Sequence, residues 1–126
     1  MVLKTQGFSL KGRAKSIAFA GRGVILMIKS QHNAWIHLVA TLVVVFASLI
    51  FELSKIELSI VVLTIMTVWV AEALNTAFEF LCDVVSPEFH PLVEKSKDIA
   101  AGAVLISSIC AIIVGGIIFF PYLSNF

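Results

Sequence analysis

The stretch AEALNTAFEF, residues 71–80, places carboxylate and amide side chains inside a long apolar run. Glu72, Asn75 and Glu79 fall on one stripe of a helix, because each residue advances a helix by roughly 100°; Asp83 continues the stripe. On an apolar helix such a stripe must face protein or a water-filled cleft. Carboxylates arranged in this way can hold a hard cation such as Mg²⁺, act as a general base or relay protons. The residues alone leave these uses open, beside a purely structural role in helix packing.

The composition is typical of an integral membrane protein. Of the 126 residues, 60% are hydrophobic and 13% are charged, which is more apolar than a soluble domain of this length. Three apolar spans, 34–51, 56–81 and 99–120, are each near the ~20 residues that a helix needs to cross a bilayer. We predict an all-α integral membrane protein forming a single membrane domain over residues 1–126. Nothing in it indicates a nucleic-acid partner.

The segment before the first span, residues 8–31, mixes basic with apolar side chains. This mixture predicts an amphipathic helix on the membrane surface, which Gly12, Gly21 and Gly23 are candidates to interrupt. Eight of the nine Lys and Arg residues lie before the first span or between the second and third. The positive-inside rule therefore places the N-terminus in the cytoplasm.

The connection after the second span, SPEFHPLVEKSKD, adds polar groups near the same interface. Lys97 is a natural partner for phosphate, and Asp98 stands where an N-cap would begin the third span. Carboxylates for a cation and a lysine for phosphate indicate phosphoryl transfer at a membrane surface. The chain has no GxxxxGK[ST] motif, so a P-loop is excluded.

The first span opens with three residues of polar or amphipathic character, Asn33, Trp35 and His37. Trp35 is typical of an anchor at headgroup depth. Asn33 and His37 share a helical face by their i,i+4 spacing. We expect that they can meet the carboxylate stripe of a neighbouring helix.

Three segments together resemble one known family: EALNTAFE, DVVSPEFHPL and KSKDIAAGAVL. They are similar to the small prokaryotic diacylglycerol kinases, a family that includes undecaprenol kinases, and the resemblance covers roughly residues 13–120. It implies three transmembrane helices, an N-terminal surface helix and a homotrimer in the bacterial inner membrane. It also implies active sites shared between neighbouring subunits at the cytoplasmic interface.

Matched to the family's motifs, Glu72 corresponds to the general base that acts on the lipid hydroxyl, with Asn75 beside it as the second catalytic residue. Glu79 corresponds to the glutamate that holds Mg²⁺, the expected cofactor. The positions that the resemblance associates with ATP are Phe19, Gln31, Glu79, Glu88, Phe89, His90, Lys97 and Asp98. Those expected to contact the lipid substrate are Glu72, Trp35 and Ala101.

Two positions depart from the family pattern. Many members carry a second metal-binding Glu where this chain has Gln31, and a neutral oxygen is a weaker ligand for Mg²⁺ than a carboxylate. Phe89 stands where Tyr is common, which removes a hydroxyl and keeps the ring.

The expected activity is transfer of the ATP γ-phosphate to diacylglycerol, which gives phosphatidic acid. The alternatives are an undecaprenol kinase of the same family and, from a different class, a small proton-coupled transporter that uses Glu72 as its relay.

Overall fold

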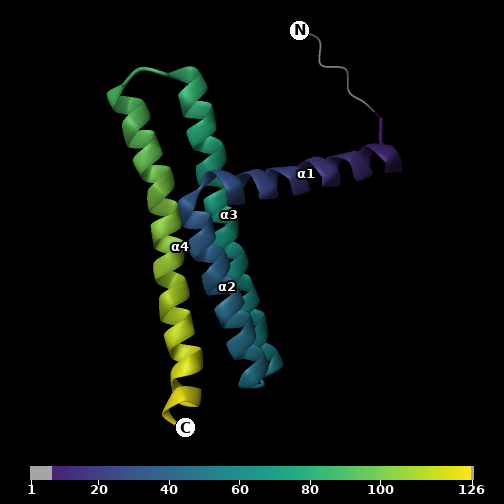
Figure 1. Ribbon diagram of the computed structural model, residues 1–126, viewed down its shortest axis with the longest axis vertical. Helices are drawn as coiled ribbons and strands as arrows, with labels where there is room; N and C mark the ends of the chain where they lie inside the picture. Colours follow the sequence, from purple (N-terminus) through teal and green to yellow (C-terminus); the bar gives the residue numbers. More distant parts are fainter. Residues whose placement is uncertain (1–6, 126) are drawn as a thin grey trace.

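The structure is a computed structural model that describes residues 7–125; residues 1–6 and 126 of the predicted membrane domain lie outside this range. The described chain folds into four helices: α1 (Leu10–Ser30), α2 (His32–Ile50), α3 (Lys55–Val85) and α4 (Pro91–Ser124). Of these, α2, α3 and α4 are each long and apolar enough to cross a membrane. The prediction of an all-α chain with three such helices is confirmed. Figure 1 shows these three along the long axis of the molecule, with α1 leaving them sideways as an arm.

The α1 arm is one continuous helix, and none of its glycines interrupts it. Its first turn is capped by Ser9, whose hydroxyl accepts a hydrogen bond from the backbone N–H of Gly12 at 2.9 Å. This cap satisfies one of the N–H groups that a helix start leaves unpaired. The arm ends at Gln31, where an extended backbone (φ −121°, ψ 125°) turns the chain into α2. Gln31 therefore stands at the corner between the arm and the bundle.

The turn into α3 is set by a capping box. The Ser54 hydroxyl accepts from the backbone N–H of Glu57 at 3.2 Å, and the Glu57 carboxylate accepts from the backbone N–H of Ser54 at 3.1 Å. This reciprocal pair starts the helix at Lys55. The preceding reversal is tight, and Glu52 adopts a positive φ of 50° there.

The fourth helix begins earlier than the sequence suggested. Its N-cap is His90, whose Nδ1 accepts from the backbone N–H of Leu92 at 3.2 Å, and Pro91 occupies the first turn. The assignment of Asp98 as the N-cap was therefore wrong, because the helix already starts at Pro91 and is capped by His90. Asp98 lies inside α4, and only residues 86–90 join α3 to α4. We call the end of the bundle that carries residues 86–90 the loop end.

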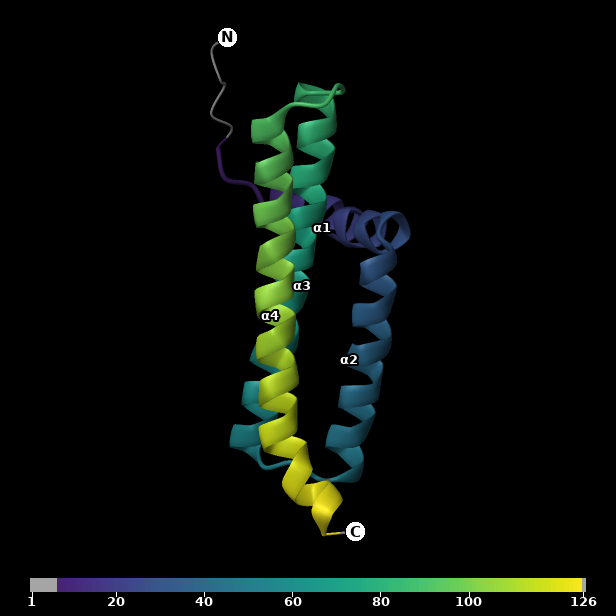
Figure 2. The same cartoon turned by 90° about the vertical axis from the view of Figure 1, so that its left-hand side faces the viewer.

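The helices α3 and α4 pack side by side, whereas α2 stands apart from them for much of its length (Figure 2). At the end opposite the loop end, the Tyr122 hydroxyl donates to Glu57 at 2.7 Å, and the Tyr122 ring stacks on Phe51 with centroids 5.5 Å apart. These contacts tie α4 to the α2–α3 turn.

Few side chains are buried, and they include polar ones. The buried apolar residues are Met27, Ala34, Val61, Val68, Cys82, Val104 and Ile118, and the buried polar or charged residues are Ser48, Glu72, Asn75, Thr76 and Ser107. Large apolar side chains such as Leu63 are exposed instead. This distribution suits a chain whose outer surface meets lipid or neighbouring subunits and whose polar groups must face protein.

We predict that Tyr122→Phe lowers the midpoint of thermal unfolding in detergent, because it removes the hydrogen bond to Glu57 and keeps the ring stacked on Phe51. Tyr122→Ala should lower it further, because it removes both contacts. An unchanged midpoint in Tyr122→Ala would show that this end of the bundle is held by other contacts.

Candidate functional site

The predicted acidic stripe of α3 faces protein at Glu72 and Asn75, whereas Glu79 is half-buried and Asp83 is exposed. Glu72 has no exposed surface, and Asn75 and Thr76 are only 6% and 3% exposed. A fully buried carboxylate is unusual, because removing a charge from water is costly unless a partner compensates for it. The partner of Glu72 therefore decides what this site can do.

That partner is His37 of α2. Its Nε2 lies 3.3 Å from Oε2 of Glu72, as the spacing of Asn33 and His37 suggested. The two groups touch without hydrogen-bond alignment, and neither carboxylate oxygen receives a hydrogen bond from the described residues. Glu72 thus keeps its accepting capacity for a further donor.

Trp69 contacts the His37 ring, and Thr41 links Trp69 to the His37 backbone. Trp69 of α3 meets the ring edge-on, with ring centroids 6.1 Å apart. The Trp69 Nε1–H donates to the Thr41 hydroxyl at 2.9 Å, and that hydroxyl donates to the backbone carbonyl of His37 at 2.7 Å. The sequence reading missed this support, although Trp69 precedes Glu72 by three residues and Thr41 follows His37 by four. The first spacing places Trp69 and Glu72 on one face of α3, and the second places His37 and Thr41 on one face of α2.

A cavity of about 260 Å³ lies between these helices and α4. Its polar lining consists of Asn33, His37, Asn75 and Ser108, and Ala101, a predicted lipid-contacting residue, lies in the same wall. The Asn75 Oδ1 is buried without a hydrogen-bond partner. A second cavity of about 280 Å³, almost wholly apolar, shares His37 and Ser108 with the first and continues between α2 and α4. Polar groups therefore line part of the first cavity, whereas apolar side chains line almost all of the second.

The two residues predicted to hold the metal are brought together. The Gln31 Nε2–H donates to Oε2 of Glu79 at 2.9 Å, joining the corner between α1 and α2 to the stripe on α3. In this arrangement the amide nitrogen faces the carboxylate. A cation shared by both residues needs the amide turned over, so that the Gln31 oxygen takes the place of its nitrogen.

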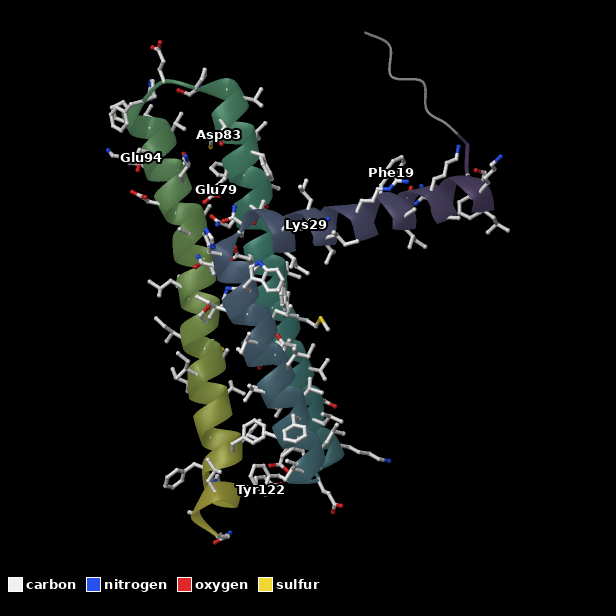
Figure 3. The ribbon with its side chains drawn as sticks, viewed as in Figure 1. Phe19, Lys29, Glu79, Asp83, Glu94 and Tyr122 are labelled. Carbon is white, nitrogen blue, oxygen red and sulfur yellow. The ribbon has the colours of Figure 1, made fainter. Side chains whose placement is uncertain are left out.

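Most of the remaining predicted site residues lie towards the loop end, where Figure 3 labels Asp83. The Lys97 ammonium lies 3.7 Å from the Asp83 carboxylate, a partly exposed pair that contributes little stability. His90, the α4 cap, also lines a cavity of about 450 Å³ between α3 and α4. Glu88, Phe89 and Asp98 have exposed side chains.

Two predicted site residues stand apart from this cluster. Phe19 lies out on the α1 arm, 63% exposed, and Figure 3 shows it far along the arm from Glu79. The Arg22 guanidinium lies 5.3 Å from the centre of the Phe19 ring. Trp35 at the start of α2 is 53% exposed. A single chain therefore does not bring Phe19 to the other predicted ATP residues.

Comparison with known proteins identifies the family of this chain. Residues 18–119 match the family described as prokaryotic diacylglycerol kinase. The chain belongs to this family. It is 38% identical over 109 residues to the undecaprenol kinase of Bacillus subtilis, covering 86% of this chain and 89% of that protein.

Two further relatives of the chain are diacylglycerol kinases. The one from Synechocystis is 38% identical over 107 residues, which cover 84% of this chain and 61% of that protein. The one from Escherichia coli K12 is 30% identical over 116 residues, which cover 89% of this chain and 83% of that protein. The family resemblance seen in the motifs is confirmed, and the chain is a multi-pass membrane protein of a prokaryotic lipid kinase family.

Kinases that use ATP generally need a divalent metal, and the residues here suit one. Glu79 offers a carboxylate, and Gln31 would offer an amide oxygen once its amide is turned over from the orientation in which the nitrogen donates to Glu79. Among residues 7–125 no group of three or more His, Cys, Asp or Glu side chains is placed to hold an ion. This donor set matches Mg²⁺, which proteins usually bind through one or two carboxylates together with substrate phosphates and water.

We predict that Gln31→Glu lowers the Mg²⁺ concentration needed for half-maximal stabilisation by nucleotide. The change creates two carboxylates in contact, and their repulsion is relieved by a cation. The measurement is a Mg²⁺ titration of the thermal unfolding midpoint with ATP present. Ser30→Glu, which adds the same charge one residue away, is the control. Equal midpoint shifts in both variants would argue against a metal site at Gln31 and Glu79.

Proposed function

We propose that this protein is an ATP-dependent diacylglycerol kinase that transfers the γ-phosphate to the lipid hydroxyl and gives phosphatidic acid. The observation that carries the proposal is the placement of two different sites on one helical stripe. Glu79, which contacts Gln31 in the expected metal site, lies seven residues after the buried Glu72 on α3. Seven residues of α-helix rise by about 10 Å, which is the separation of the two sites along the helix. The triphosphate of a bound ATP is long enough to extend from the expected metal site towards Glu72.

In this proposal the protein positions the reactants and offsets charge, as in other phosphoryl transfers. Glu79 and Gln31 would hold Mg²⁺, Lys97 would add a positive charge near the phosphates, and Glu72 is the carboxylate on which removal of the hydroxyl proton depends. Asn75 orients the hydroxyl. The metal, when bound, supplies charge neutralisation on the phosphates.

The remaining nucleotide contacts are assigned to the loop end. There His90 lines the cavity of about 450 Å³, and Glu88, Phe89 and Asp98 are exposed close by in the chain. For the lipid, we propose that Ala101 and Trp35 contact the substrate, with Ala101 in the wall of the polar cavity. The apolar cavity that continues from it gives the lipid chain a surface of matching character.

We further propose a homotrimer in the bacterial inner membrane, with the N-terminus and the loop end in the cytoplasm. The arm α1 would lie on the membrane surface, and its Phe19 would reach the nucleotide held by a neighbouring subunit. Two observations support a contact of Phe19 with a neighbouring subunit. Phe19 lies out on the arm, far from Glu79 of the same chain (Figure 3), and its ring is exposed.

Undecaprenol is the second candidate substrate. The relative from Bacillus subtilis, 38% identical over 89% of its length, is named an undecaprenol kinase, whereas relatives named diacylglycerol kinase are 38% and 30% identical. Both lipids present an alcohol to the same chemistry and differ in their apolar chains.

Product analysis tests the substrate. Purified protein in mixed micelles is supplied with Mg²⁺, radiolabelled ATP and either diacylglycerol or undecaprenol, and the lipid products are separated. We expect labelled phosphatidic acid. Label only on undecaprenol would support the second candidate, and label on neither lipid would refute the proposed kinase.

For Glu72→Gln we predict a folded protein whose turnover falls by about 100-fold or more, the range in which loss of a general base acts. The apparent affinity for ATP should stay close to that of the original chain. Glu52→Gln neutralises an exposed carboxylate at the opposite end of the bundle and serves as the control. Turnover in Glu72→Gln equal to that control would remove Glu72 from the reaction.

A further inference from the structure

The polar and the apolar cavity meet at Ser108 of α4, whose side chain lines both of them. Nearer the start of α4, Ala101 lines only the polar cavity. One turn beyond Ser108, Ala111 and Ile112 line only the apolar cavity. The third helix follows the same order, because it supplies Asn75 to the polar cavity and only apolar side chains to the other. Of the described α4 residues that line either cavity, Ser108 is the only polar one, and it stands at their boundary.

The hydroxyl of Ser108 has no hydrogen-bond partner within residues 7–125. The other Ser and Thr hydroxyls of the three apolar spans each donate to a backbone carbonyl of their own helix; they belong to Thr41, Ser48, Ser59, Thr64, Thr67, Thr76 and Ser107. The carbonyl four residues before Ser108 is that of Val104, and it already accepts from the Ser107 hydroxyl at 3.0 Å. Ser108 is only half-buried, so a free donor lies in the wall of both cavities.

We propose that Ser108 determines the class of lipid that this protein accepts, by donating a hydrogen bond to an ester carbonyl of a diacylglycerol. The inference rests on the proposed kinase function and specifies the substrate of the same site. It concerns recognition alone, because an uncharged hydroxyl donates to a carbonyl oxygen without transferring its proton.

A diacylglycerol presents its groups in the order in which the two cavities can receive them. Its free hydroxyl is a few bonds from the ester carbonyls, and the acyl chains follow directly after those carbonyls. The hydroxyl can lie beside Asn75, whose buried Oδ1 lacks a partner. The esters then come to Ser108 at the boundary, and the acyl chains continue into the apolar cavity. Each part of the lipid thus meets a wall of matching character.

An isoprenoid alcohol such as undecaprenol presents a different pattern. Its hydroxyl is followed at once by hydrocarbon, so no acceptor arrives at Ser108. The hydrocarbon would cover the Ser108 hydroxyl and leave its hydrogen bond unmade, which costs free energy. A site that offers a hydrogen bond to its substrate discriminates in this way against an analogue that lacks the partner. Ser108 therefore favours a diacylglycerol over an isoprenoid alcohol.

The other polar side chains near the boundary are engaged or lie elsewhere. His37 also lines both cavities, but its Nε2 is buried 3.3 Å from the Glu72 carboxylate. The Thr41 hydroxyl, in the wall of the apolar cavity, donates to the backbone carbonyl of His37. Asn33 lines the polar cavity alone. Ser108 is thus the donor that remains for an ester at the boundary.

The first test compares a diacylglycerol with the dialkylglycerol of equal chain length, in which ethers replace the esters. The dialkyl lipid keeps the hydroxyl and both chains and lacks the carbonyls. We expect kcat/KM of the unaltered protein to favour the diacyl lipid by about 10-fold, as the loss of one hydrogen bond implies. Ser108→Ala should bring this ratio close to one, and Ser108→Thr, which keeps a hydroxyl, should retain most of it.

The matched control is Ser107→Ala, which removes the neighbouring hydroxyl that is bonded inside α4. Its ratio of diacyl to dialkyl turnover should equal that of the unaltered chain. An unchanged ratio in Ser108→Ala would overturn the proposal. An equal fall in Ser107→Ala would overturn it too, because the packing of α4 and not one hydroxyl would then set the preference. An unaltered protein that phosphorylates undecaprenol and neither glycerolipid would have the same consequence.

The second test needs no turnover and so separates this inference from the kinase function. The midpoint of thermal unfolding in detergent is measured with each lipid and without ATP, since a ligand of the folded state raises it. The diacyl lipid should raise the midpoint of the unaltered chain more than the dialkyl lipid, and Ser108→Ala should remove that difference. A difference that persists in Ser108→Ala, or is absent from the unaltered chain, would overturn the role of Ser108. A Ser108-dependent difference without any phosphorylated lipid would refute the kinase and support the lipid site.

Discussion

The burial of one carboxylate constrains the rest of this structure. Glu72 has no exposed surface, in a helix that is otherwise apolar around it. An ionised carboxylate without water costs several kcal/mol unless charge or hydrogen bonds compensate for it. His37 is the group that meets it, Trp69 contacts the His37 ring, and Thr41 links Trp69 to the His37 backbone. The contact between α2 and α3 is thus organised around a single ionisable pair.

The same stripe also runs from a buried carboxylate to more exposed ones. Glu72 has no exposed surface, whereas Glu79, two turns further along α3, is half-buried and meets Gln31 at the corner between the arm and the bundle. A lipid alcohol and a nucleotide phosphate need these two different surroundings. Placing both acids on one rigid helix fixes their separation, which is what a reaction between a membrane substrate and a water-soluble one requires.

The sequence was sufficient to predict the three long apolar helices and the grouping of Glu72 and Asn75 on one face of α3, because both depend on local patterns. Apolar length identified the three spans, and helical periodicity identified the inward stripe. It failed at the start of α4, where Pro91 and His90 begin the helix before Asp98 does. It also could not give the distance of 3.3 Å between His37 and Glu72, since that depends on how α2 leans on α3. In the proposed trimer, the position of Phe19 relative to the nucleotide would depend on a neighbouring subunit, which periodicity within one chain does not describe.

The most direct measurement of the central claim, that Glu72 and His37 act as one unit, is a double-mutant cycle on kcat. Its members are the unaltered chain, Glu72→Gln, His37→Gln and the double variant, assayed with the same lipid and saturating Mg²⁺-ATP. We expect the double variant to be no slower than the slower single variant, because either change alone already removes the unit. Losses that multiply in the double variant would contradict it, because two groups acting independently would each contribute their own factor.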